Sequence, residues 1–167
     1  MDLHLIRHAI AEESSGSGRD SDRALTAEGK AKMLRCAEGL RAIDVRLDLI
    51  LTSPYRRAVE TAEIVAGALG AVETHVLQEL AAGCDIPTLL AALRPYRHVE
   101  GLALVGHQPD LGYLASQVMS GSPSACHLPF KKGGAACLEI PTARGPLRGE
   151  LVWLMTPKQL RALRGTL

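Results

Sequence analysis

Short apolar runs alternate with longer segments of helical periodicity along this chain. Six of the short runs are predicted to be strands, at residues 3–7, 47–51, 72–77, 102–105, 135–140 and 150–155. The first, second and fourth runs are apolar enough for the centre of a sheet, whereas the third resembles an edge strand. This alternation is typical of an α/β domain with a largely parallel sheet.

The segments between these strands carry recognisable helix starts. Thr26 is predicted to cap a helix that runs to about residue 43, and Ser53, followed by Pro54, to cap another that runs to about residue 69. Further helices are expected over residues 87–93, from Pro109 to about residue 119, and from Pro157 onward. The turn-forming stretch PTARGPLRG predicts that the last two strands form a hairpin-like pair, with an antiparallel member at a sheet edge.

Together these elements predict a three-layer α/β/α fold around a mostly parallel sheet of roughly six strands. The 167 residues match the usual size of one domain, so we expect a single domain over residues 1–167. Two connecting segments, residues 11–22 and 120–134, are rich in glycine, serine and charge. Both are predicted to be loops that border a functional site.

Composition narrows the classes of partner. There are 19 Lys and Arg against 18 Asp and Glu, a net charge of +1, so nothing predicts broad attraction to nucleic acid or to an anionic membrane. No apolar stretch resembles a signal peptide or a membrane span, and we expect a cytoplasmic protein. The four cysteines lack zinc-site spacing and are predicted to be free thiols: Cys36, Cys84, Cys126 and Cys137.

Basic residues gather where three predicted strands end. They are Arg7 and His8 at the end of the first strand, Arg56 and Arg57 in the helix after the second, and His107 after the fourth. Ligands of parallel α/β sheets bind outside the carboxyl ends of the strands, so we expect these side chains to meet. A helix start ordinarily favours acidic residues, and two arginines there indicate a bound phosphate held by guanidinium and backbone N–H groups.

Each of these residues also has an ordinary structural interpretation. A single histidine after a strand is often only a hydrogen-bonded structural residue, and Arg57 alone could be a solvated helix charge. Their joint occurrence at three strand ends favours function. A metal site built from His4, His8, His75 and His107 is disfavoured, because strand alternation points His4 away from the strand-end site.

Three motifs carry a resemblance to a known family. LIRHA, SPYRRAVETA and VGHQP resemble, in order and spacing, the signatures of the histidine phosphatase superfamily, which has a phosphoglycerate mutase-like fold. The stretch from Arg23 to Thr26 and the closing WLMTPKQL are similar to the small SixA-type protein phosphohistidine phosphatases, which lack a large cap insertion. Ala9 stands where many members have glycine.

The resemblance implies a reaction and a set of residues. His8 matches the nucleophile that forms a covalent phosphohistidine intermediate, while Arg7, Arg57 and His107 match the phosphate-binding residues. No metal or other cofactor is implied. Ser53 is carried over only as a helix cap.

The general acid is left open by the sequence. Glu79 occupies the place where larger members of the superfamily carry a proton-donating acid, and Asp85 in the next loop is also within reach. Either could be a solvated carboxylate. An imidazole leaves more easily than an alkoxide once it is protonated, so a phosphohistidine substrate tolerates a weak or absent acid.

The length of the segment after the third strand predicts the class of substrate. Only the short stretch 80–85 follows the third strand, where metabolite-directed members carry a longer insertion, so we expect an open site that suits phosphohistidine on a signalling protein. The alternatives are a phosphomonoesterase or mutase for a small phosphorylated metabolite, or a noncatalytic phosphate-binding regulatory module. The first would use a basic rim of Arg19, Arg23, Lys131 and Lys132.

Overall fold

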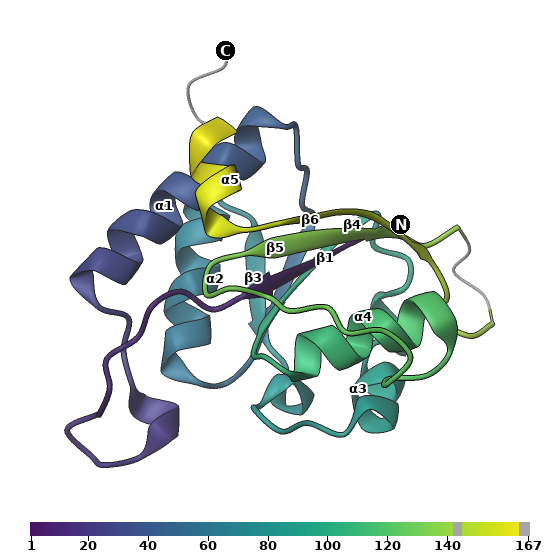
Figure 1. Cartoon of the computed structure of the whole chain (residues 1–167), viewed down its shortest axis with the longest axis horizontal. Coiled ribbons are helices and arrows are strands. Elements are labelled where there is room, and N and C mark those ends of the chain that lie inside the picture. Colours follow the sequence, from purple (N-terminus) through teal and green to yellow (C-terminus); the bar gives the residue numbers. More distant parts are fainter. Residues whose placement is uncertain (142–144, 164–167) are drawn as a thin grey trace.

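The computed structural model describes residues 1–141 and 145–163 and contains one six-stranded sheet, with strand order β3-β2-β4-β1-β5-β6 (Figure 1). The strands are β1 (Asp2–Arg7), β2 (Leu49–Thr52), β3 (Glu73–Val76), β4 (Gly101–Gly106), β5 (Ala135–Glu139) and β6 (Glu150–Met155). β1, β2, β3 and β4 pair in parallel, and β5 pairs antiparallel with both β1 and β6. The mostly parallel sheet predicted from the apolar runs is confirmed.

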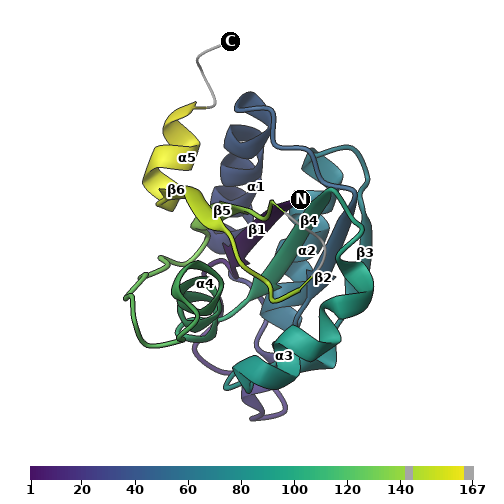
Figure 2. The ribbon, with the colours of Figure 1, turned by 90° about the vertical axis from the view of Figure 1, so that its right-hand side faces the viewer.

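Helices cover both faces of this sheet, which confirms the three-layer architecture (Figure 2). α1 (Ala27–Ala42), α2 (Arg56–Ala68) and α5 (Pro157–Leu163) lie on one face, and α3 (Ile86–Ala92) and α4 (Asp110–Ser120) lie on the other. Single 3-10 turns add η1 (Asp20–Asp22), η2 (Gln78–Leu80) and η3 (Arg94–Tyr96). Each face of the sheet therefore has its own apolar core.

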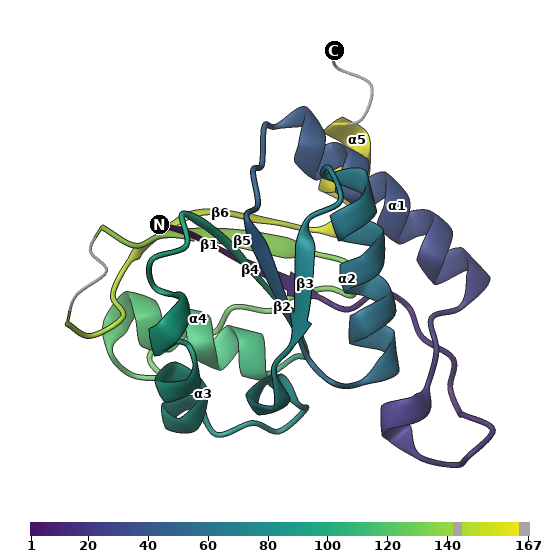
Figure 3. The same cartoon turned by 180° about the vertical axis from the view of Figure 1, so that it is seen from behind.

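Alternation along the strands divides the side chains between these two cores. Leu3 and Leu5 of β1 pack towards α3 and α4, whereas Ile6 packs towards α1 and α2. Every residue of β2 and β4 is buried, as expected for central parallel strands. β3 is largely exposed and lies at the sheet edge, where its lower apolar content had placed it (Figure 3).

The ends of the elements test the predicted caps. The Thr26 hydroxyl accepts a hydrogen bond from the backbone N–H of Gly29 at 2.9 Å and caps α1, as predicted. Ser53 does not cap α2: the N-cap residue is Tyr55, whose side chain makes no capping bond. The Ser53 hydroxyl instead contacts His107, so the helix starts later than the Ser-Pro signal predicts.

Several other expectations can be compared with the structure. β5 and β6 form the expected pair, with β5 as the antiparallel strand and β6 at the edge, although their connection lies partly outside the described residues. The four cysteines are free thiols, as predicted. Within residues 1–141 and 145–163, no helix has the length and apolar content needed to cross a membrane.

Candidate active site

The carboxyl ends of β1, β2 and β4 bring the predicted basic side chains together. The imidazole rings of His8 and His107 lie 5.2 Å apart between centroids, and Nε of Arg57 donates a hydrogen bond to Nε2 of His8 at 3.3 Å. Arg7 is close enough for its charge to lower the pKa of both histidines. His8, Arg57 and His107 are at most 5% exposed, so one small region gathers two imidazoles and a guanidinium group away from solvent.

His8 has one nitrogen fixed by the backbone. Its Nδ1 lies 2.7 Å from the carbonyl oxygen of Ala9, which can only accept, so Nδ1 carries the proton and Nε2 keeps a lone pair. Burial, with the nearby charges of His107, Arg57 and Arg7, lowers the pKa of His8 to about 3. At neutral pH the ring is therefore a neutral imidazole, the form that can act as a nucleophile.

His107 is oriented by a residue that the sequence had assigned another role. Its Nε2 lies 2.7 Å from Oγ of Ser53, which also accepts from the backbone N–H of Tyr55 at 3.2 Å. The Ser53 hydroxyl therefore bonds to both the ring of His107 and the backbone at Tyr55, which fixes the orientation of that ring. Burial and the charge of Arg57 lower the pKa of His107 to about 4.

Two buried nitrogens of the site lack a hydrogen-bond partner. Nδ1 of His107 and Nε of Arg7 are buried without a hydrogen-bond partner among the described residues, although another nitrogen of Arg7 donates to the carbonyl of Phe130 at 2.6 Å. A buried donor without a partner costs about 1–3 kcal/mol. An anion with several acceptor oxygens would satisfy both groups at once.

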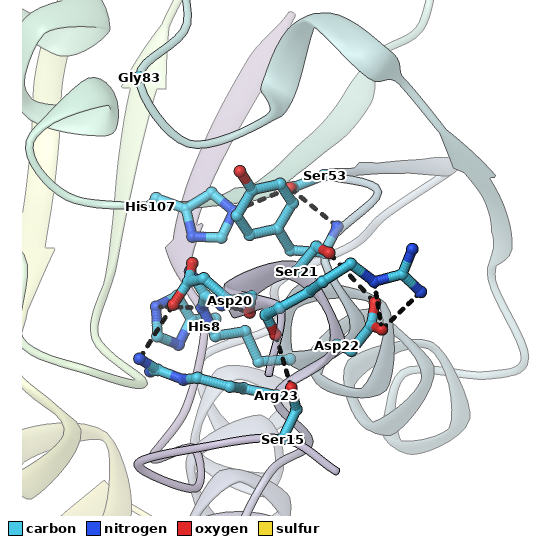
Figure 4. Close-up of polar contacts among 12 residues, drawn as sticks. His8, Ser15, Asp20, Ser21, Asp22, Arg23, Ser53, Gly83 and His107 are labelled. Atoms are coloured by element: carbon cyan, nitrogen blue, oxygen red, sulfur yellow. Dashed lines mark hydrogen bonds and ion pairs between the residues drawn. The ribbon is translucent and has the colours of Figure 1, made fainter. Parts of the chain in front are cut away.

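The loop before α1 contributes an unpredicted site residue, Asp20, from η1 (Figure 4). Arg57 donates to the carbonyl oxygen of Asp20 at 2.7 Å and to its carboxylate Oδ2 at 2.9 Å. Arg23 pairs with the other carboxylate oxygen at 3.0 Å. Residues 11–22 therefore do border the site, as expected, but their only sequence signal was a charge-rich loop.

The exposure of His8 bears on how open the site is. The connection after β3 is short, with η2 leading quickly to α3, as predicted. His8 is nevertheless only 5% exposed, and the bonds from Arg57 hold Asp20 at the edge of the site. The ring of His8 is therefore buried, while the first loop places an exposed carboxylate next to it.

The two candidate acids have different surroundings. Asp85 caps α3, accepting from the backbone N–H of Thr88 at 3.0 Å and from its hydroxyl at 2.7 Å, so its carboxylate is already engaged. Glu79 lies on η2, just beyond β3, and makes no hydrogen bond or ion pair within the described part of the chain. The role of Glu79 stays a prediction.

Two of the four residues of the suggested basic rim form ion pairs with carboxylates. Arg19 pairs with Asp22 at 2.7 Å and Arg23 pairs with Asp20, whereas Lys131 and Lys132 are exposed. Arg23 is the member of this set that reaches the site, through Asp20.

The four histidines of the disfavoured metal set do not converge. The His4 ring lies 5.9 Å from that of Trp153, and His75 pairs with Glu73 on the edge strand. Among the described residues, the single group with ligand-like spacing is Asp2, His4 and Cys137, which excludes His8 and His107.

The buried imidazoles make the stability of the fold depend on pH. Unfolded chains bind protons at histidine near pH 6.5, whereas folded His8 and His107 do so only at about 3 and about 4. The unfolded state therefore binds more protons between these values. We expect the free energy of unfolding to fall as pH drops from about 6.5 to 4, by at most about 1.4 kcal/mol per pH unit for each ring.

Urea unfolding at several pH values measures this dependence. The variant His107→Gln should show a shallower loss of stability, because it removes one of the two titrating rings. An identical slope in the variant and the parent chain would contradict the assignment.

The fold and the side chains of the site together define a class of protein. Two imidazoles and the guanidinium of Arg57 lie together at the carboxyl edge of a parallel sheet, with the charge of Arg7 close enough to affect both rings, as in proteins that bind and transfer phosphoryl groups. The family model of the histidine phosphatase superfamily (branch 1) matches residues 3–84.

Known proteins match over almost the whole chain. A protein of Picosynechococcus sp. described only as uncharacterized is 37% identical, with 96% of this chain and 99% of that protein covered. The phosphohistidine phosphatase SixA of Escherichia coli K12 is 31% identical, with 96% and 97% covered. A structure of the protein histidine phosphatase SixA complexed with tungstate has a TM-score of 0.85 at 26% identity, covering 96% of this chain and 99% of that one.

The chain therefore belongs to the histidine phosphatase superfamily, and within it to the SixA-type branch that the motifs had indicated. Both the resemblance and the phosphoglycerate mutase-like fold that it implied are confirmed. The fold and these relatives support a phosphatase as the functional class.

Proposed function

We propose that this chain hydrolyses phosphohistidine on another protein through a covalent phosphoryl intermediate on His8. The observation that carries this proposal is the pair of buried, unpartnered nitrogens, Nε of Arg7 and Nδ1 of His107, beside the lone pair on Nε2 of His8. A phosphoryl group in this position would supply acceptors to the donors and phosphorus to the nucleophile.

The reaction follows from the orientation of each group. Nε2 of His8 attacks phosphorus in line with the leaving atom. The Ala9 carbonyl continues to accept from Nδ1–H, and this bond stabilises the ring as the ring gains positive charge. Arg7, Arg57 and His107 donate to the phosphoryl oxygens as their charge develops. Water then attacks the phosphorylated His8, releases phosphate and restores the neutral ring.

The acid and the partner belong to the same proposal. Glu79 remains the candidate acid for substrates whose leaving group needs a proton, and Asp85 is the weaker candidate because it caps α3. A phosphorylated protein as partner is supported by the relative from Escherichia coli, which is a phosphohistidine phosphatase. No metal takes part in the proposed reaction.

Turnover of matched substrates tests the proposed specificity. The purified chain should release phosphate from a phosphohistidine-bearing carrier protein with a kcat/KM at least about tenfold above that for 3-phosphoglycerate or phosphoserine, a difference of 1.4 kcal/mol. Fast turnover of the small esters with none of the carrier protein would favour the metabolite enzyme instead. Phosphate binding without any turnover would favour the noncatalytic module.

A further inference from the structure

A single guanidinium group, that of Arg57, connects a carboxylate to the proposed nucleophile. Arg57 contacts Nε2 of His8 through its Nε, and the carboxylate of Asp20 through a terminal nitrogen. Figure 4 shows Asp20 beside His8 and His107, and its charge raises the pKa of His107. A site that collects positive charge to bind an anion thus also contains a fixed negative charge at its edge.

The position of this carboxylate is well determined by the loop that carries it. The loop is closed by a bridge between Ala11 and Leu25 and by a hydrogen bond from Thr26 N–H to the Ile10 carbonyl at 3.0 Å. Leu25 N–H also donates to the Glu60 carboxylate on α2 at 2.8 Å. Several contacts therefore hold η1 against α2, which carries Arg57.

Asp20 is accessible to an incoming substrate, unlike the rings beneath it. Its side chain is 56% exposed, and each carboxylate oxygen accepts one bond, from Arg57 or Arg23. A carboxylate oxygen has two lone-pair sites, so each can accept another N–H. The hydrogen bond from Arg57 lowers the pKa of Asp20, which keeps it ionised at neutral pH.

A negative charge here acts in opposite directions on the two substrate classes. The imidazole ring of phosphohistidine, protonated on the nitrogen that does not carry phosphorus, is a cation that offers an N–H to a carboxylate. The leaving oxygen of a phosphomonoester instead gains negative charge, which Asp20 repels. An anion at the edge of the site therefore discriminates by the charge of the leaving group.

We propose that Asp20 is a specificity-determining residue that binds the protonated imidazole of phosphohistidine and disfavours phosphomonoesters. This inference rests on the proposed phosphohistidine phosphatase function. It also explains how the reaction proceeds while Asp85 is engaged as a cap and Glu79 has no partner in the described structure.

The transfer step balances without a proton donor. The lone pair on Nε2 of His8 forms the new bond to phosphorus, and the phosphorus–nitrogen bond of the substrate breaks, with its electron pair returning to that nitrogen. The substrate ring keeps the proton on its other nitrogen and leaves as neutral imidazole. Positive charge thus passes from the substrate ring, which Asp20 binds, to the ring of His8.

The variant Asp20→Asn tests this role. Asparagine keeps an oxygen that can accept from Arg57, and the backbone carbonyl of residue 20 still accepts from the same guanidinium, so the arginine should stay in place. We expect kcat/KM for a phosphohistidine-bearing carrier protein to fall about tenfold or more, because a charge-assisted hydrogen bond is lost. The value for p-nitrophenyl phosphate should stay constant or rise.

The matched control is Asp22→Asn, on the same turn. Asp22 pairs with Arg19 and Ser17 and does not contact Arg57, so both substrates should be unaffected. Equal losses for both substrates in Asp20→Asn would show that Asp20 only positions Arg57, and an unchanged ratio would likewise overturn the inference. A parent chain that hydrolyses p-nitrophenyl phosphate but never the carrier protein would overturn the proposed function together with this inference.

Discussion

Replacing His8 with alanine is expected to abolish the phosphorylated form of the protein and to lower kcat/KM by about 10,000-fold or more. The loss is large because Nε2 of His8 is the atom that forms the bond to phosphorus in the proposed reaction. Its ring is held by the Ala9 carbonyl on one nitrogen and faces Arg57 with the other. Incubation with a phosphohistidine-bearing protein labelled with radioactive phosphate, quenched in alkali, should label the parent chain at His8 and leave the variant unlabelled.

The matched control for this experiment is His75→Ala. His75 is on the edge strand β3, where its ring pairs with Glu73, so its removal should leave labelling and turnover within about twofold of the parent. Thermal unfolding of both variants establishes that the fold survives. A phosphoryl group mapped to any other residue of the parent chain would refute the assignment of His8.

Much of the fold could be predicted because its determinants are local or periodic. The fully buried β2 and β4 are central, the more polar β3 lies at the edge, and Thr26 caps α1 through a residue three positions away. The predicted start of α2 was wrong because a distant contact overrode a local pattern. Ser53-Pro54 has the local pattern of a cap, but the hydroxyl of Ser53 is used by His107, which is 54 positions later in the sequence.

The residues of the candidate site likewise fall into those that a local pattern could place and one that it could not. Arg7, His8, Arg57 and His107 could be placed together because each directly follows a predicted parallel strand or begins the next helix, and such positions share one edge of the sheet. Asp20 could not be placed, since it lies in a loop without periodicity and meets Arg57 across 37 positions. Loop conformation depends on such tertiary contacts, which no local pattern records.

Replacing Arg57 with lysine should lower kcat/KM by about 100-fold while the charge is retained. The guanidinium group makes three kinds of contact at once: with Nε2 of His8, with both the carbonyl and the carboxylate of Asp20, and with the Tyr55 ring at 4.9 Å. A lysine has one nitrogen and cannot reproduce this fork. Steady-state kinetics with a phosphohistidine-bearing protein measures the loss.

Arg56→Lys provides the matched control. Measuring the pKa of His8 in Arg57→Ala then separates the effect of the charge of Arg57 from that of its shape. Arg56 is exposed and pairs with Glu60 on the same helix, so Arg56→Lys should change turnover less than twofold. In Arg57→Ala, which removes the charge as well, the pKa of His8 measured by NMR should rise above about 3, because Arg57 is one cause of its lowering. It should stay below 6.5, since burial is the larger cause. Equal losses in the two lysine variants would show that positive charge at the start of α2, and not the fork of Arg57, is what the reaction uses.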